Sequence, residues 1–554
     1  MATLHCRLRA APPRLQGAGM TRRLVLLGVL AGLVCAAFIA GYTGYPHEPQ
    51  RRYIFDYLLR TQDLPGTALV VLIAIAAAWT RLARPALSLV EEIGRRPWST
   101  AFATFVLLCA AELLVVKGHA LAGDEHLVLM QAKAFAAGRL TAQFPPELVS
   151  WVLPRIYFDL WLYASPQTGA AVSIYWPGYA LLLTPFVLVG APWACNPLLA
   201  SGALLLIGRL AGRITGAPQA TGWAMLLTLA SPAFTGMALG YFSMTAHLFF
   251  NLLYVWALLE SRFLLAGVAG SYALVLHNPL PHTLFALPWI AWIAWRKGAR
   301  ALLSLGAGYA PIGLVLGLGW WLVMRKVQGQ LWFAPPGGDF LFYWQLQLTR
   351  VFIDPTLATL AMRAAELVKL WLWTVPGLPA LMVAGWWLAR RELSPRLLGL
   401  SFAVSLAAYL FVWFDQGYGW GVRYLHPAFA ALPILGAAAI LRLESEALRR
   451  YAAAAALLSL VLATPFRWLQ IEAFMSEQLA RRPPIDPGVR EIVFVRLNYD
   501  YYTQDFVQND PFLRAPVIFM LSRGRAEDAK LLQSRFPGAR LEREAEFGQV
   551  WRLE

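Results

Sequence analysis

The stretch that decides the fold runs from Ile214 to Leu259 and reads ITGAPQATGWAMLLTLASPAFTGMALGYFSMTAHLFFNLLYVWALL. It contains no Asp, Glu, Lys or Arg. About 20 apolar residues span a bilayer, and an ionised side chain inside the bilayer is costly. The stretch is therefore long enough for about two transmembrane passes, or for one pass with a re-entrant or interfacial segment.

The whole chain has the same character. Of its 554 residues, 58% are hydrophobic and 14% are charged, against about 45–50% and about 25% in soluble domains. A soluble protein could not cover this apolar surplus with polar groups, so the composition excludes one. Further uncharged runs cover residues 24 to 46, 64 to 80, 160 to 208, 263 to 295, 301 to 324, 370 to 389, 397 to 414, 424 to 441 and 451 to 466. We expect about thirteen spans.

The net charge of +16 is interpreted as an orientation signal rather than as a nucleic-acid site, because cytoplasmic loops retain Lys and Arg. The basic clusters fall in alternate loops if the N-terminus is cytoplasmic and residues 176 to 190 dip into the membrane without crossing it. The outer face then carries residues 43 to 63, 118 to 175, 277 to 282, 325 to 365, 415 to 423 and the tail from about 468. We expect a multi-pass protein of the bacterial cytoplasmic (inner) membrane with a periplasmic C-terminus. The clusters are Arg22/Arg23, Arg81/Arg84/Arg95/Arg96, Arg209/Arg213, Glu260/Arg262, Arg296/Lys297/Arg300, Arg390/Arg391/Arg396 and Arg442/Arg449/Arg450.

The tail differs in kind from the rest of the chain. Residues 491 to 497, 517 to 521 and 547 to 553 have the apolar pattern of strands, and 526 to 536 the pattern of an amphipathic helix. We therefore predict an all-α polytopic membrane protein with outer juxtamembrane helices and a small C-terminal α/β domain on the outer face. Its parts are expected at 1 to 97 (cytoplasmic N-terminus and two extra spans), 98 to 467 (the main transmembrane domain, with outer loop 118 to 175) and 468 to 554.

The stretch richest in chemistry follows the third span and reads GDEHLVLMQAKAFAAGRL, residues 123 to 140. Leu127, Met130 and Ala134 share one helical face, which predicts a short helix lying on the outer membrane surface. Asp124 is either the N-cap of this helix, with Glu125 complementing the helix dipole, or part of an acidic pair that supplies a general base and a ligand for a metal or an acceptor. The spacing leaves both interpretations open.

Four further motifs follow in order along the chain. The Asp-Glu pair with A-x-x-x-A-x-G-R-L is followed by Tyr175-Trp-Pro-Gly-Tyr-Ala-Leu-Leu-Leu183, Gly421-Val-Arg-Tyr-Leu425, Asn509-Asp-Pro-Phe and Phe536-Pro-Gly-Ala-Arg. Together they resemble the C-type membrane glycosyltransferases, the superfamily of protein O-mannosyltransferases and aminoarabinose transferases. Within this superfamily, the sequence looks most like the bacterial members that are similar to dolichyl-phosphate-mannose-protein mannosyltransferases. The resemblance covers nearly the whole chain after about residue 98.

The resemblance implies an enzyme that transfers a sugar, with inversion, from a polyprenyl-phosphate donor to a glycan, lipid or protein acceptor outside the membrane. The attacking acceptor hydroxyl must lose a proton, which assigns Asp124 as the base with Glu125 beside it. The phosphate leaving group needs a cation, and Arg423 is best placed, unless it is an interfacial arginine that binds membrane lipid head groups. The other residues expected to bind substrate or phosphate are Tyr175, His247, His426 and Arg350.

This sequence departs from the family pattern in its histidines. Family members that bind a divalent metal use an outer acidic residue near the second motif, and this sequence has none there. His277 and His282 flank an outer turn, and His126 is expected on the same face. With a carboxylate they predict a divalent metal site for Mg, Mn or Zn. The alternative is hydrogen bonding to phosphate or to carbonyls freed by the intervening prolines.

Two other features are functional candidates. Glu112 in the third span is either functional or snorkels to the interface. Residues 325 to 365 form a loop long enough to cover the site.

Two other protein classes are alternatives to a transferase. A surface-polysaccharide polymerase or ligase is also multi-pass with an outer loop, but it requires neither the early Asp-Glu loop nor the α/β tail. A transporter usually has a two-fold internal repeat and ionisable residues near mid-membrane. This sequence shows no repeat, and its acidic candidates are predicted to gather at one face.

Overall fold

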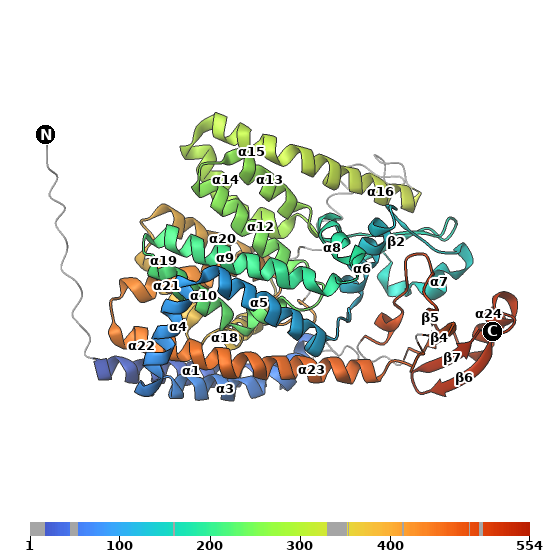
Figure 1. Cartoon of the computed structure of the whole chain (residues 1–554), viewed down its shortest axis with the longest axis horizontal. Coiled ribbons are helices and arrows are strands. Elements are labelled where there is room, and N and C mark those ends of the chain that lie inside the picture. Colours follow the sequence, from blue (N-terminus) through green and yellow to red (C-terminus); the bar gives the residue numbers. More distant parts are fainter. Residues whose placement is uncertain are drawn as a thin grey trace.

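The computed structural model describes residues 17–44, 54–158, 161–329, 352, 354–412, 415–486, 488–497 and 502–553. Within these ranges six helices are long and apolar enough to cross a membrane: Gly19–Gly44, Ile54–Ala76, Pro97–Val116, Pro192–Thr215, Gly298–Gln328 and Glu446–Ala480. Six shorter apolar helices accompany them: Gly178–Leu188, Met244–Leu259, Phe263–Leu274, Leu378–Leu388, Leu393–Tyr409 and His426–Arg442. The chain is a multi-pass membrane protein. The predicted all-α polytopic fold with a small C-terminal α/β domain is confirmed (Figure 1).

The helices form three groups along the chain. The first group is α1 (Gly17–Gly44), α2 (Ile54–Leu58), η1 (Leu59–Asp63), α3 (Leu64–Ala76), η2 (Thr80–Leu82), α4 (Ala83–Arg95), α5 (Pro97–Ala111) and η3 (Glu112–Val116). The middle group is α8 (Gly178–Leu188), η6 (Pro192–Ala194), α9 (Cys195–Thr215), α10 (Gln219–Leu229), α11 (Pro232–Met237), α12 (Met244–Leu259), α13 (Phe263–Leu274), α14 (Leu280–Arg296), α15 (Gly298–Ile312), η7 (Gly313–Leu318) and α16 (Gly319–Gln328). The last group is α18 (Leu357–Leu372), α19 (Leu378–Leu388), α20 (Leu393–Tyr409), η8 (His426–Ala428), α21 (Ala431–Arg442), α22 (Glu446–Leu458), η9 (Ser459–Ala463) and α23 (Thr464–Ala480).

Small residues let several of these helices approach closely. A Cβ on Gly385 of α19 would lie 1.9 Å from the carbonyl oxygen of Leu435 in α21. Between α13 and α15, a Cβ on Gly267 would lie 2.1 Å from the carbonyl oxygen of Leu305. Such contacts are typical of membrane bundles, where packing rather than water exclusion drives association.

Helix α8 is too short to cross a membrane. It has 11 residues and is about 16 Å long at 1.5 Å per residue, whereas the hydrocarbon layer is about 30 Å thick.

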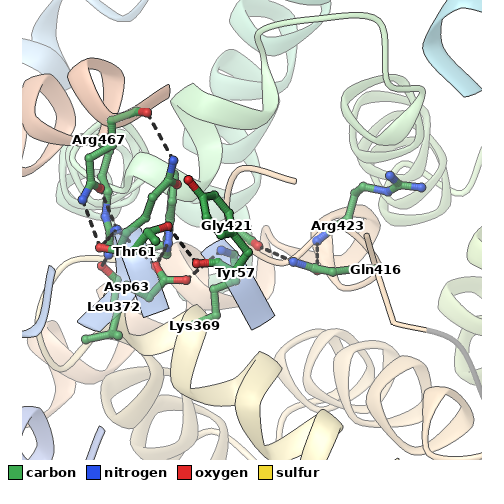
Figure 2. Close-up of polar contacts among 12 residues, drawn as sticks. Tyr57, Thr61, Asp63, Lys369, Leu372, Gln416, Gly421, Arg423 and Arg467 are labelled. Atoms are coloured by element: carbon green, nitrogen blue, oxygen red, sulfur yellow. Dashed lines mark hydrogen bonds and ion pairs between the residues drawn. The ribbon is translucent and has the colours of Figure 1, made fainter. Parts of the chain in front are cut away.

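A buried charge cluster, here called the Asp63 cluster, joins the N-terminal helices to the rest of the bundle (Figure 2). Asp63 at the end of η1 pairs with Lys369 of α18 at 2.8 Å and with Arg467 of α23 at 3.1 Å. Trp373 Nε1 donates to the same carboxylate at 2.5 Å. A Cβ on Gly66 would lie 2.5 Å from Arg467 Nη2, so the glycine makes room for the guanidinium. All three charged side chains are buried.

Two small sheets complete the fold. Between α5 and α8 lie α6 (Gly123–Ala136), β1 (Ala142–Gln143), η4 (Pro146–Leu148), α7 (Val149–Val152), η5 (Arg155–Tyr157), β2 (Leu162–Ala164) and β3 (Ala170–Ser173), whose sheet has the order β1-β3-β2. The tail folds as β4 (Glu491–Val495), η10 (Gln504–Phe506), β5 (Val517–Leu521), α24 (Arg525–Arg535), β6 (Arg540–Ala545) and β7 (Gly548–Arg552).

The tail sheet has the order β5-β4-β7-β6, with β4 parallel to β5 and the other pairs antiparallel. The three predicted strands and the predicted helix are present. The sequence did not predict β6, because this mostly exposed edge strand is rich in charge and lacks an apolar alternation. Gln143 N donates to the carbonyl of Pro511 at 2.9 Å, and Trp151 packs edge-on against Phe494, so the tail lies against the segment that contains α6 and α7 (Figure 1).

Candidate active site

The acidic pair predicted from the sequence opens α6. The N-cap position is Ala122, and no side chain caps the helix, so Asp124 is not the N-cap. Its Oδ2 instead accepts a hydrogen bond from Arg423 Nη2 at 3.0 Å, and its Oδ1 accepts from the backbone N–H of Glu125 at 3.1 Å. The two predicted reacting residues, 299 positions apart, therefore form an ion pair.

Helix α6 is enclosed by protein on nearly every side. Leu127, Met130 and Ala134 are buried, as predicted for its apolar face. Glu125 and Gln131, on other faces, are buried as well. The expectation of a one-sided surface helix is wrong, because α8 and the strands β1 and β3 pack around α6.

A loop between α20 and η8 presents Arg423. Gln416 Oε1 accepts from the backbone N–H of Arg423 at 2.8 Å, and Gln416 Nε2 donates to the carbonyl of Gly421 at 3.0 Å (Figure 2). Gly421 has φ +99°, and a Cβ there would lie 2.7 Å from Ala233 Cβ. This position therefore requires glycine on both conformational and steric grounds. The guanidinium lies 4.2 Å from the ring centroid of Phe242.

Aromatic side chains lie next to the ion pair. The ring of Tyr175 stacks on His277 with 3.9 Å between centroids. Burial, and then the negative charge of Asp124, raise the pKa of the Tyr175 hydroxyl, while Arg423 acts in the opposite direction. Burial lowers the pKa of His277 well below its ordinary value, helped by His247 and Arg423. His277 is therefore a neutral imidazole at neutral pH, and the positive charge beside Asp124 comes from Arg423.

The other predicted histidines are buried. His282 is held between Asn251 Oδ1 at 2.7 Å and the Tyr309 hydroxyl at 2.5 Å. Within the described ranges, neither ring nitrogen of His247 has a hydrogen-bond partner, nor has Nε2 of His426. His126 is buried in α6.

A metal site does not fit these residues. No three His, Cys, Asp or Glu side chains in the described part of the chain are grouped so that they could hold a metal ion. Both ring nitrogens of His282 are already engaged. The described residues thus offer the predicted divalent ion no ligand set, and no chemical step below uses one.

Glu125 and Glu112 hold one backbone turn between them. Glu125 Oε1 accepts from the N–H of Tyr241 at 2.7 Å and its Oε2 from the N–H of Leu121 at 3.1 Å. Glu112 Oε2 accepts from the N–H of Gly240 at 2.7 Å. Burial raises the pKa of Glu125 to about 8, against the opposing effect of the Tyr241 N–H. Both Glu125 oxygens bind backbone N–H groups, so this side chain ties the start of α6 to the turn at Tyr241.

Glu112 does not snorkel. Its side chain is fully buried, and Oε1 has no partner in the part of the chain that the structure describes. Gly240 makes the arrangement possible: its φ is +82°, and a Cβ there would lie 2.5 Å from Glu125 Oε1. The sequence marked Glu112 as a candidate, but gave no sign that it shares a turn with Glu125.

The C-terminal domain also holds the start of α6. Asp505 Oδ1 accepts from the Tyr157 hydroxyl at 2.7 Å, and the same carboxylate is hydrogen-bonded to the backbone N–H of Gly123. Gln508 Nε2 donates to the carbonyl of Ala120 at 2.5 Å. Burial raises the pKa of Asp505 to about 7, although the bonds from Tyr157 and Gly123 oppose the shift. No motif in the sequence pointed to this contact.

Two predictions fall on residues outside the described ranges. Arg350, expected to bind phosphate, is one of them, and most of the predicted cover loop, including Pro335 to Asp339, is the other.

Comparison with known proteins places this geometry in a known fold. No family model and no curated protein matches the chain. Solved structures do match. Among them are ArnT from Cupriavidus metallidurans in the apo state, 12% identical with a TM-score of 0.51 over 82% of this chain and 97% of that chain, and ArnT bound to undecaprenyl phosphate, 13% identical with a TM-score of 0.49 over 82% and 98%. The chain has the fold of ArnT. The fold that the resemblance implied is thereby confirmed.

Proposed function

We propose that this protein transfers a sugar, with inversion, from a polyprenyl-phosphate donor to an acceptor on the periplasmic side of the bacterial cytoplasmic membrane. The observation that carries the proposal is the contact of 3.0 Å between Asp124 and Arg423. Their side chains are 10% and 11% exposed, so both are largely removed from water yet reachable from it. The reaction needs a base for the acceptor hydroxyl and a cation for the phosphate in the same place.

Each partner has the chemistry for its role. Asp124 accepts the proton of the attacking hydroxyl. As the new bond to the anomeric carbon forms, the bond to the phosphate oxygen breaks and its electron pair stays on the phosphate. Arg423 stabilises the charge that the phosphate gains. Tyr175 stacks on His277, and both feel the charge of Arg423. His247 and His426 have ring nitrogens without partners among the described residues, and we assign these nitrogens to phosphate or sugar oxygens.

The fold and the charge distribution supply independent support. ArnT, whose fold the chain shares, binds undecaprenyl phosphate. The arginine clusters favour a cytoplasmic N-terminus and a periplasmic C-terminal domain. That orientation would place the lipid-linked donor and a glycan, lipid or protein acceptor at the end of the bundle where α6 and the tail sheet lie.

The test is mass analysis of envelope glycans and lipids from cells that carry the gene, lack it, or carry Asp124→Asn. Glu147→Gln is a matched control, because Glu147 is an exposed carboxylate in the same segment and pairs with Arg535 on the surface. We expect one sugar-modified species to disappear without the gene and with Asp124→Asn, and to persist with Glu147→Gln. Unchanged glycans and lipids in the deletion strain would refute the proposal. An accumulated or depleted small solute would instead favour a transporter, and shortened surface polysaccharide a polymerase or ligase.

A further inference from the structure

We propose that the Asp124–Arg423 ion pair is a masked form of the site, which the donor phosphate opens by competing with Asp124 for Arg423. This inference rests on the proposed function and adds an order to it. The donor binds first, and the base becomes available only afterwards.

Each oxygen of Asp124 already accepts a hydrogen bond without a donor. Oδ1 accepts from the backbone N–H of Glu125, and Oδ2 accepts from Arg423. A carboxylate oxygen has a second lone pair, but an oxygen that is bound to a cation is a weaker acceptor for the acceptor hydroxyl than one released from it. Because the bond to Arg423 joins two ionised groups, it restrains the carboxylate more than the bond from the neutral amide does.

Arg423 is well fixed at its backbone, while its guanidinium, which lies 4.2 Å from the ring centroid of Phe242, has few hydrogen-bond partners. Gln416 binds its N–H at 2.8 Å, whereas the guanidinium makes one long bond of 3.3 Å to the carbonyl of Tyr418 besides its bond to Asp124. A guanidinium has five N–H donors. Its Nε has no partner within the described part of the chain, so it has spare donors for a second anion.

A phosphate is a better match for those donors than one carboxylate oxygen. Arginine binds phosphate through two parallel N–H bonds, while Asp124 uses one oxygen here. The donor carries a phosphodiester with one negative charge, and transfer of the sugar leaves a phosphomonoester with up to two. The attraction of the phosphate for Arg423 therefore grows along the reaction, while the proton taken up by Asp124 neutralises its competitor.

The masking sets the order of binding. The base is released only when the donor phosphate has taken its place at Arg423, so the reactive state forms only in the loaded site. The acceptor then binds second.

The competition predicts that one inactive variant binds a phosphate ligand more tightly than the wild type does. Asp124→Asn removes the rival anion, so it should bind a phosphate ligand more tightly even though it transfers no sugar. If Asp124 only held Arg423 in place for the phosphate, the same substitution would weaken binding.

The experiment measures binding of a polyprenyl monophosphate to the full chain in lipid nanodiscs, with thermal unfolding of each variant as the fold control. We expect at least fivefold tighter binding for Asp124→Asn and at least tenfold weaker binding for Arg423→Met. Asp124→Ser, which also removes the charge, is measured in parallel in case the asparagine variant does not fold. Adding Asp124→Asn to Arg423→Met should give little further change, because the competition acts through the arginine.

The outcomes separate the inference from the function on which it rests. Unchanged or weaker binding in both Asp124 variants, with weaker binding in Arg423→Met, would overturn the masking and leave the proposed function standing. Equal tightening with and without Arg423 would also overturn it, because general charge repulsion would then be the cause. No binding of the phosphate to any form, wild type included, would overturn the proposed function itself.

Discussion

Removal of the Asp63 carboxylate should destabilise the protein more than any surface change. In the Asp63 cluster one carboxylate faces two cations, Lys369 and Arg467, and all three side chains are buried. Asp63→Asn keeps an oxygen that can accept from Trp373, but it leaves both cations without a counter-charge.

The expected magnitude follows from that geometry. Breaking a buried ion pair by removing one partner costs about 3–5 kcal/mol, and two stranded cations place Asp63→Asn at the upper end. For a chain of 554 residues the loss corresponds to a fall in Tm of roughly 3–4 °C. The Asp63→Asn/Lys369→Met double variant has the same net charge in the cluster as the wild type, so it should recover a large part of the loss.

The assay is thermal unfolding of the purified protein in one detergent, followed by intrinsic fluorescence. Asp354→Asn is the matched control, since it makes the same chemical change at an exposed aspartate. Equal Tm values for Asp63→Asn and Asp354→Asn would refute the reasoning. So would a double variant that is less stable than Asp63→Asn alone.

Two further predictions concern pH and topology. Because burial raises the pKa of Glu125 to about 8, the folded state holds a proton that the unfolded state releases above about pH 4.5, so Tm should fall as pH rises from about 5 to about 8. Glu125→Gln should show a smaller fall over this range, and an identical pH profile would contradict the assignment. Cysteine at Gln533, in an otherwise cysteine-free chain, should react with a membrane-impermeant reagent in intact cells, while cysteine at Gln219 should react only after lysis. The reverse pattern would invert the topology.

The fold could be predicted because apolar runs and charge carry most of its information. The uncharged runs 64 to 80 and 370 to 389 begin directly after Asp63 and Lys369, and the run 451 to 466 ends directly before Arg467. Each charge was visible as the end of a run. Their meeting was not, because pairing across more than 300 positions depends on how the helices pack.

The candidate site could be predicted only in part. Asp124 and Arg423 were assigned complementary roles from local motifs, and the structure brings them together. The spacing also allowed Asp124 to be the N-cap. Local helix propensities contain no information about a distant arginine that binds the same carboxylate, so they could not decide between the two interpretations. Glu125 was placed with the reacting groups because it is adjacent in sequence, whereas its oxygens bind the backbone of Leu121 and Tyr241.

The central claim is that Asp124 and Arg423 carry out sugar transfer from a polyprenyl-phosphate donor. The most direct measurement incubates the purified protein with a polyprenyl-phosphate sugar labelled in the sugar, together with envelope acceptors, and follows the movement of label out of the lipid fraction. The account predicts steady transfer by the wild type and by Glu147→Gln, and a loss of at least a hundredfold in Asp124→Asn with its fold intact. Transfer by Asp124→Asn at the wild-type rate would contradict it.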